Sequence, residues 1–256
     1  MKNITMRLPF TPRVFAMFSN KEDQILAGIE HNQGYYEPHI MNFLARHLTK
    51  PDAVCLDIGA NIGAIALAMG ILAPQGRVYA FEPSSFSFPF LVQNIRINAL
   101  PNITPVQRGV YDDNIEMAFT YVDFGSAWSH ITTPHANNGV QEVIQCVKID
   151  DWVRQEGLDR LDLIKLDVEG AEIHALNGAR ETIQRFRPDL IVEFNPKAYQ
   201  SIFNEDPAKL YRLLEELFPK ISVIDFNDAV IPVQSYEQLM AFYQDGREVS
   251  DLFCTF

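Results

Sequence analysis

The feature that most constrains this sequence is a glycine-rich turn between a predicted buried strand and a predicted helix. The apolar run AVCLDI occupies Ala53–Ile58, and the turn Asp57-Ile-Gly-Ala-Asn-Ile-Gly63 overlaps its end. Small apolar residues continue from Gly63 to Leu72 at helical spacing, until a proline and a glycine end the pattern. Glycines permit a tight turn and the close approach of a ligand, and the helix that follows offers free backbone N–H groups. The turn therefore predicts a ligand site where the strand meets the helix.

The alternation of strand-like and helix-like segments continues through most of the chain. With 256 residues, 47% of them hydrophobic, the chain is long enough to fold as one α/β domain around a mostly parallel sheet. The other predicted strands are Arg77–Phe81, Ile103–Val106, Leu161–Leu166, Asp189–Phe194, Ile221–Asp225 and Leu252–Phe256, and the predicted helices are Phe88–Ala99, Gly170–Phe186, Pro207–Phe218 and Tyr236–Tyr243. Two β-rich runs, Glu116–Val122 and Val140–Ile149, predict a hairpin-like insertion before the fourth strand, Leu161–Leu166.

A carboxylate at the end of the second predicted strand narrows the ligand class. Glu82 follows Arg77–Phe81, and a carboxylate at this place can accept hydrogen bonds from both hydroxyls of a ribose. Alone, the glycine-rich turn would indicate a plain strand–turn–helix corner, and Glu82 alone would indicate a surface glutamate. Together, the two features favour a nucleoside site. The dinucleotide fingerprint G-x-G-x-x-G fails, because Asn61 replaces the middle glycine and Ala64 stands at the last position. The chain also lacks a GxxxxGK[ST] phosphate loop, so an adenosine ligand without phosphate, such as S-adenosylmethionine, fits best.

Three motifs resemble those of the FkbM family of S-adenosylmethionine-dependent methyltransferases. They are VCLDIGANIG at 54–63, FEP at 81–83 and IKLDVEGAE at 164–172, with supporting matches in GYYEP (34–38), LVQNIRIN (91–98), VKIDDW (147–152), ALNGA (175–179) and the final DLFCTF. The resemblance implies an α/β class I methyltransferase (Rossmann-like) fold. That fold has a seven-stranded, mostly parallel sheet with helices on both faces and one reversed strand at the end, here with the β-rich insertion before the fourth strand.

The resemblance also implies which residues hold S-adenosylmethionine and its product S-adenosylhomocysteine. Glu82 would bind the ribose hydroxyls, and the adenine would lie near residues 109–112, in contact with Asp112. Asn94 and Asn98 could line the cofactor side of their helix or lie on its exposed face. The remaining cofactor-binding candidates border the methionine and ribose parts, or orient the loop and the amino group: Gly59, Asn61, Gly63, Asp57 and Glu37.

The catalytic candidates follow from the chemistry of methyl transfer. The in-line displacement needs an acceptor oxygen held close to the sulfonium carbon, and a base helps because the hydroxyl loses its proton. Asp167, which follows the fourth predicted strand, is the first candidate for positioning or for the base, and Glu169 and His130 come next. Glu169 could equally cap the following helix, and His130 could be a surface histidine on an irregular loop. Lys165 could form a structural ion pair or contact the substrate.

Oxygen ligands at the same edge of the sheet raise the question of a metal. Asp167, Glu169 and Glu193 could form a magnesium site, as in some O-methyltransferases. The three cysteines show no CxxC pattern, and no His/Asp spacing demands a metal. We therefore expect no metal, although a divalent ion fits the chemistry.

The expected acceptor is a hydroxyl on a small molecule, a sugar or a glycan. The alternatives are N-methylation of an amine or peptide, and a non-catalytic module that only binds the cofactor. The sequence NPKAY at 195–199 resembles the NPPY motif of amine and base methyltransferases, but it follows the fifth strand and not the fourth, which weighs against N-methylation. A formal charge of −12 argues against nucleic acid as a partner.

The ends of the chain complete the expected organisation. We predict an N-terminal arm or lid at residues 1–33 and a single methyltransferase domain at 34–256, with the arm able to make a homodimer. The acceptor pocket would come from the arm, the 123–139 loop and the region after Asn195. The longest nearly apolar segment, Ile62–Pro74, is shorter than the roughly 20 residues that span a bilayer, and no signal peptide is evident. We therefore expect a cytoplasmic protein without a membrane span.

Overall fold

The main sheet of the computed structural model has eight strands in the order β5-β4-β3-β10-β11-β14-β12-β13. The structure describes residues 1–122, 129–135, 139–244 and 246–256. The strands are β3 (Val54–Ile58), β4 (Arg77–Phe81), β5 (Ile103–Val106), β10 (Leu163–Leu166), β11 (Asp189–Phe194), β12 (Lys220–Ile224), β13 (Val230–Val233) and β14 (Ser250–Thr255). The five strands β5, β4, β3, β10 and β11 are parallel to one another, and β14 is antiparallel to both β11 and β12. The expected seven strands with a reversed last strand are thus present.

The eighth strand, β13, departs from the expectation of a seven-stranded sheet. It pairs antiparallel with β12 at the edge of the sheet, where Pro232 faces Ser222 in the register. A proline cannot donate to a strand ladder and is tolerated at an edge. The short proline-containing run VIPV therefore gave no strand signal in the sequence.

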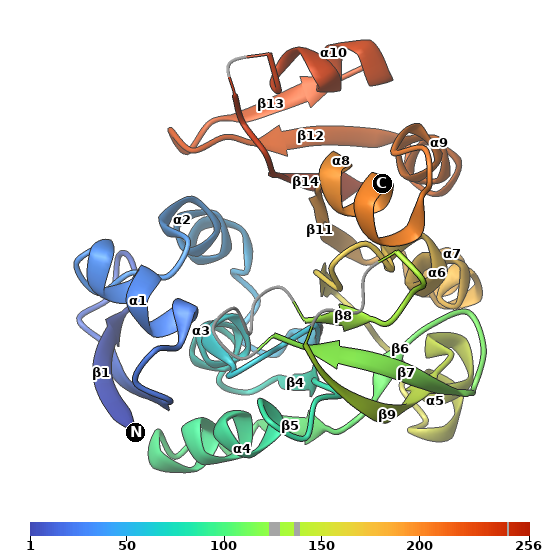
Figure 1. Ribbon diagram of the computed structural model, residues 1–256. Helices are drawn as coiled ribbons and strands as arrows, with labels where there is room; N and C mark the ends of the chain where they lie inside the picture. The colour runs from blue at the N-terminus through green and yellow to red at the C-terminus, as the bar shows by residue number, and fades with distance from the viewer. Residues whose placement is uncertain (123–128, 136–138, 245) are drawn as a thin grey trace.

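Helices cover both faces of the sheet, as expected (Figure 1). One face carries α1 (Gln24–His31), α2 (Pro38–His47), α3 (Ala64–Leu72) and α4 (Phe88–Ile97); the other carries α5 (Ile149–Gln155), α6 (Glu172–Asn177), α7 (Arg180–Phe186), α9 (Ala208–Leu217) and α10 (Tyr236–Ala241). Successive strand residues point to opposite faces, so Cys55 belongs to the first core and Leu56 to the second. In the described ranges, no helix is both long and apolar enough to cross a membrane.

The predicted single helix Gly170–Phe186 is wrong, because the chain forms α6 and α7 with a break between them. Gly178 stands at the break, and a Cβ there would overlap the carbonyl oxygen of Tyr111. The close approach of the Tyr111 segment requires a glycine and interrupts the helix.

An N-terminal hairpin docks onto α4 through two side-chain amides. Strands β1 (Lys2–Arg7) and β2 (Val14–Ser19) pair antiparallel. Asn94 accepts a hydrogen bond from the backbone N–H of Phe18 (2.8 Å) and donates to its carbonyl (3.1 Å), and Asn98 does the same with Ala16 at 2.8 Å each. Asn94 and Asn98 therefore do not lie free on an exposed face, and Asn94 also donates to the carbonyl oxygen of Ile62 in the glycine-rich turn at 2.8 Å. Residues 1–33 also share the first core, and the division of the chain at residue 33 stays a prediction.

The predicted β-rich insertion is confirmed as a second sheet with the strand order β6-β9-β7-β8. Its strands are β6 (Gly109–Val110), β7 (Glu116–Tyr121), β8 (His130–Ile131) and β9 (Val140–Val147). Within the 123–139 loop that we expected at the acceptor pocket, residues 123–128 and 136–138 lie outside the described residues. The main sheet reverses its strand order between β3 and β10, and the insertion sheet lines one side of the cavity at that point. Ligands of open α/β sheets bind at such a point, beyond the carboxyl ends of the strands.

Candidate cofactor and active site

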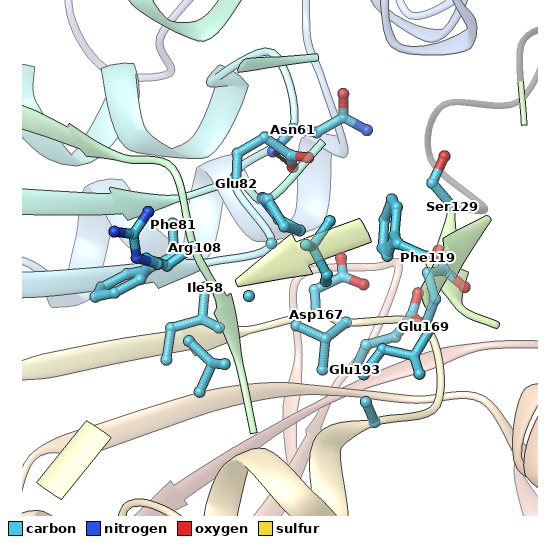
Figure 2. A pocket seen from close by; sticks show the side chains of 18 of the residues that line it. Ile58, Asn61, Phe81, Glu82, Arg108, Phe119, Ser129, Asp167, Glu169 and Glu193 are labelled. Carbon is cyan, nitrogen blue, oxygen red and sulfur yellow. Dashed lines mark hydrogen bonds between the residues drawn. The ribbon is translucent and has the colours of Figure 1, made fainter. Parts of the chain in front are cut away.

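A cavity opens at the carboxyl ends of β3, β4, β10 and β11, under the insertion sheet (Figure 2). It holds about 1000 Å³ of space including its open mouth, which suits a ligand of nucleoside size. Figure 2 shows Glu82 and Asn61 together on one wall and the carboxylates of Asp167, Glu169 and Glu193 on another. Cofactor-binding candidates and catalytic candidates thus line one cavity.

Glu82 is buried at the end of β4 and faces this cavity. Its carboxylate accepts hydrogen bonds from the backbone N–H groups of Asn61 (2.9 Å) and Ser84 (2.8 Å). Burial raises the pKa of Glu82 to about 7, against the lowering effect of these two N–H groups. The side chain is held in one orientation, and each carboxylate oxygen keeps a lone pair that could accept a ribose hydroxyl.

The glycine-rich turn owes its shape to positive φ angles. Gly59 has φ of 89°, and a Cβ at this position would overlap the carbonyl oxygen of Asp167, so the turn and the end of β10 touch. Asn61 has φ of 50°, and its Oδ1 atom is buried without a hydrogen-bond partner among the described residues. Gly63 begins α3 at φ of 97°, and a Cβ there would stand 2.7 Å from a methyl carbon of Leu91. Gly59 and Asn61 line the cavity, whereas the constraints on Gly63 are its backbone conformation and its packing.

Asp57 and Glu37 meet at a smaller cavity that adjoins the first one and shares Gly59, Asn61 and Asp167 with it. Asp57 is almost fully buried, and its Oδ2 atom has no hydrogen-bond partner in the described part of the chain. Glu37 precedes α2 with φ of 35° and lines both cavities. Burial raises the pKa of each carboxyl group to about 7. An unpaired buried acceptor is costly, and an ammonium group of a ligand would satisfy it.

Of the residues that we expect near the adenine, Gly109 and Val110 line the cavity, and Asp112 is not among its lining residues in the described chain. Phe119 and Ile144 of the insertion sheet, which the sequence did not single out, line it as well. Asp112 instead binds Nδ1 of His174 at 2.8 Å, on the outer side of this segment. Val110 therefore faces the cavity, whereas Asp112 contacts His174.

Three carboxylates gather at the end of the cavity opposite Glu82. One oxygen each from Asp167, Glu169 and Glu193 lie within 4.8 Å of one another. Burial, and then the charge of Asp167, raises the pKa of Glu169 and of Glu193 well above the usual value. Three oxygens at this spacing could also hold a divalent cation such as Mg²⁺. The expectation that no metal is needed stays a prediction.

Glu169 lies in the loop after β10 with φ of 52°, and not in the helix that it was alternatively expected to cap. The neighbouring Glu172 fixes this loop, because its carboxylate accepts from the N–H groups of Val168 (2.9 Å) and Gly170 (3.1 Å). Tyr199 donates its hydroxyl hydrogen to the same carboxylate. Glu172 therefore holds Glu169 in place at the cavity wall.

His130 stands in the short strand β8, and not on the irregular loop that we expected. It is buried and pairs with Thr120 of β7. Its neighbours Ser129 and Ile131 line the cavity, and His130 is not among the lining residues of the described chain. Adjacent residues of a strand point to opposite faces, which explains why the lining skips His130.

Comparison with known proteins bears on this geometry. The sequence profile of the Methyltransferase FkbM domain matches residues 57–218, which is more than half of the chain. The chain belongs to the FkbM methyltransferase family. Its match spans the glycine-rich turn, Glu82, and the carboxylates Asp167, Glu169 and Glu193. Glu37 and the N-terminal hairpin lie outside it.

Two curated relatives and one solved structure show how far the similarity extends. The 2-O-methyltransferase NoeI of Sinorhizobium fredii is 30% identical over 156 residues, which cover 55% of this chain and 63% of NoeI. The hexuronic acid methyltransferase AglP of Haloferax volcanii is 27% identical over 172 residues, covering 64% of this chain and 62% of AglP. The matched region thus spans less than two thirds of either relative. The crystal structure of methyltransferase FkbM from Methylobacillus flagellatus aligns with 80% of this chain and 44% of its own, at a TM-score of 0.50 and 19% identity, which supports the fold.

Proposed function

We propose that this FkbM-family chain transfers the methyl group of S-adenosylmethionine to a hydroxyl oxygen of a small molecule, a sugar or a glycan. The observation that carries the proposal is the joint placement of Glu82, two unpaired buried oxygens and Asp167 around two adjoining cavities. Hydroxyls of a ribose match the Glu82 carboxylate, and an α-amino group matches Asp57 Oδ2. This set of hydrogen-bond acceptors fits the cofactor that the family uses.

The cofactor, when bound, supplies a methyl group on a positively charged sulfur. Asp167 stands at the junction of both cavities, where its carboxylate could orient an acceptor hydroxyl and accept its proton. The acceptor oxygen gains the methyl group, the C–S bond electrons return to sulfur, and the hydroxyl proton passes to the carboxylate. The aromatic rings of Tyr36 and Phe119 line the same cavity.

Two observations favour oxygen over nitrogen as the acceptor atom. The motif at 195–199 is used within the fold: Asn195 accepts from the N–H of Ala198 at 3.1 Å and begins α8 (Pro196–Ala198), and Tyr199 is buried against Glu172. These two polar side chains are therefore occupied by internal hydrogen bonds. The relative NoeI is named for methyl transfer to an oxygen, which supports an oxygen acceptor here, and AglP is named for a hexuronic acid, which supports a sugar.

A transfer assay tests the proposal. The protein is incubated with tritium-labelled S-adenosylmethionine and a panel of neutral methyl glycosides, hexuronic acids, simple phenols, primary amines, a short peptide and RNA. We expect label in a hydroxyl-bearing compound, with base-stable methyl ether linkage. Label in the amine or peptide alone would contradict oxygen methylation, and label in RNA alone would contradict the expected acceptor class.

A further inference from the structure

Four neighbouring strands carry ionisable side chains on the same face of the sheet, at the edge where the cavities open. Asp57 of β3 faces Lys165 of β10 in the strand register, and Glu193 of β11 faces Asp251 of β14. Asp167 comes two residues after Lys165 and continues the same alternation. Next to this row the same face is apolar, since Cys55, Leu163 and Ile191 belong to the first hydrophobic core. Buried charged side chains are stable only when they pair with groups of opposite charge or with hydrogen-bonding groups.

Lys165 is the centre of this row. Its side chain is 2% exposed, and its Nζ atom lies 3.2 Å from Oδ2 of Asp167 and 3.5 Å from Oδ1 of Asp251. A buried ammonium group is stable only when carboxylates or other acceptors replace its water. Lys165 therefore forms a structural ion pair, one of the two roles expected for it, and it links Asp167 at the cavity wall to Asp251 behind it.

Asp251 is in turn held from a third element. Its Oδ2 atom lies 3.1 Å from Nε2 of His39 on α2, and both side chains are about nine-tenths buried. The ring of His39 packs edge-on against the ring of Phe226 at 4.8 Å between centroids. A continuous chain of contacts thus runs from α2 through β14 and β10 to Asp167.

We propose that Asp251 is a positioning residue for methyl transfer, which acts through Lys165 to hold the Asp167 carboxylate in one orientation. The proposal rests on the proposed function, in which Asp167 meets the acceptor. Asp167 follows the end of its strand and its side chain is 27% exposed, so Lys165 restrains a group that the backbone alone leaves free to rotate. Asp167 and Asp251 both attract the ammonium group of Lys165, and this double contact holds the group in place. His39 keeps Asp251 facing Lys165.

This arrangement assigns a role to parts of the chain beyond the FkbM match. His39 and Asp251 both lie outside residues 57–218. The N-terminal helix α2 and the last strand therefore contribute to the geometry of the reaction centre as well as to the core.

Nuclear magnetic resonance of the full chain tests the contact chain without an acceptor. In protein labelled with ¹⁵N at lysine Nζ, we expect one ammonium signal that is protected from exchange with water, and Lys165→Met should remove it. Asp251→Asn and Asp167→Asn should each shift this signal, and His39→Gln should shift it less. Asp52→Asn is the matched control, because Asp52 is an exposed partner of Arg160. A signal that Asp251→Asn moves no more than this control does would overturn the proposal.

Bound S-adenosylmethionine with a ¹³C-labelled methyl group tests whether the effect reaches the transfer point. We expect Asp251→Asn to shift the bound methyl signal, and we expect no additional shift in the Asp167→Asn background, since Asp251 acts through Asp167. A shift that persists unchanged in that background, or no shift where Asp167→Asn alone gives one, would refute the positioning role. A wild-type protein that does not bind the labelled cofactor would contradict the proposed function, and the lysine signal would still decide whether the contact chain exists.

Discussion

The backbone of Gly59 rests against the carbonyl oxygen of Asp167, so closely that a single methyl group on Gly59 would overlap that oxygen. The contact joins the glycine-rich turn after β3 to the loop after β10, and these two segments carry the cofactor-binding and the catalytic candidates. Backbone packing across the switch point of the sheet thus fixes the distance between the glycine-rich turn and Asp167.

The variant Gly59→Ala should lose stability and cofactor binding together. Overlap with Asp167 and a positive φ both oppose the new methyl group, and we expect a loss of about 3 kcal/mol or more in the free energy of unfolding. Gly157→Ala is the matched control, because Gly157 also has a positive φ but has open space around it. Its expected cost is about 1 kcal/mol, from the backbone alone. Equal losses in urea unfolding of the two variants would contradict the contact.

Replacement of Glu82 by alanine should weaken the binding of S-adenosylhomocysteine. The lost hydrogen bonds from the ribose hydroxyls to a charged group predict a loss of roughly 1–3 kcal/mol. Titration calorimetry measures the change, and thermal unfolding checks that the turn still folds, because the N–H groups of Asn61 and Ser84 lose their acceptor. Glu156→Ala, on an exposed carboxylate outside the cavity lining of the described chain, is the control. Unchanged affinity in Glu82→Ala would remove the ribose assignment.

The variant Asp167→Asn should separate chemistry from cofactor binding. Asparagine keeps the size of the side chain but cannot accept the acceptor's proton, so we expect turnover to fall by about 10²-fold or more, as for a lost general base. The affinity for S-adenosylhomocysteine should stay nearly the same. Equal turnover, measured by methyl transfer to an acceptor found in the panel, would exclude Asp167 from the reaction.

The buried acids should make the protein without ligand less stable as the pH rises. Burial raises the pKa of Asp57 to about 7 from a usual value near 4, so the folded state holds a proton there that the unfolded state releases. The stabilisation is therefore complete below about pH 4 and is lost as the pH rises toward 7. Asp57→Asn removes this titration, and its stability relative to wild type should improve by up to about 4 kcal/mol between pH 4 and pH 8. A difference that is independent of pH in urea unfolding would show that Asp57 stays ionised in the folded protein.

Local patterns allowed the sequence to predict the strand, turn and helix around Gly59 and the strand before Glu82. In these segments, burial follows a regular period and the turn needs glycine. The hairpin β1–β2 was missed because its edge is satisfied by the side chains of Asn94 and Asn98, which come from a helix far away in sequence. The partner of Asp112, the burial of His130 and the contact of Lys165 with Asp251 likewise depend on which segments meet in space. Residue type and local spacing do not predict such contacts between distant segments.

Calorimetric titration of the wild-type protein with S-adenosylmethionine and S-adenosylhomocysteine, beside NAD and ATP, tests whether the cavity at Glu82 is a site for S-adenosylmethionine. We expect micromolar binding of the two adenosyl sulfur compounds and no binding of the phosphate-bearing nucleotides, because Asn61 would crowd a pyrophosphate. Binding of NAD or ATP with equal affinity, or no binding of S-adenosylhomocysteine, would contradict the assignment of the cavity.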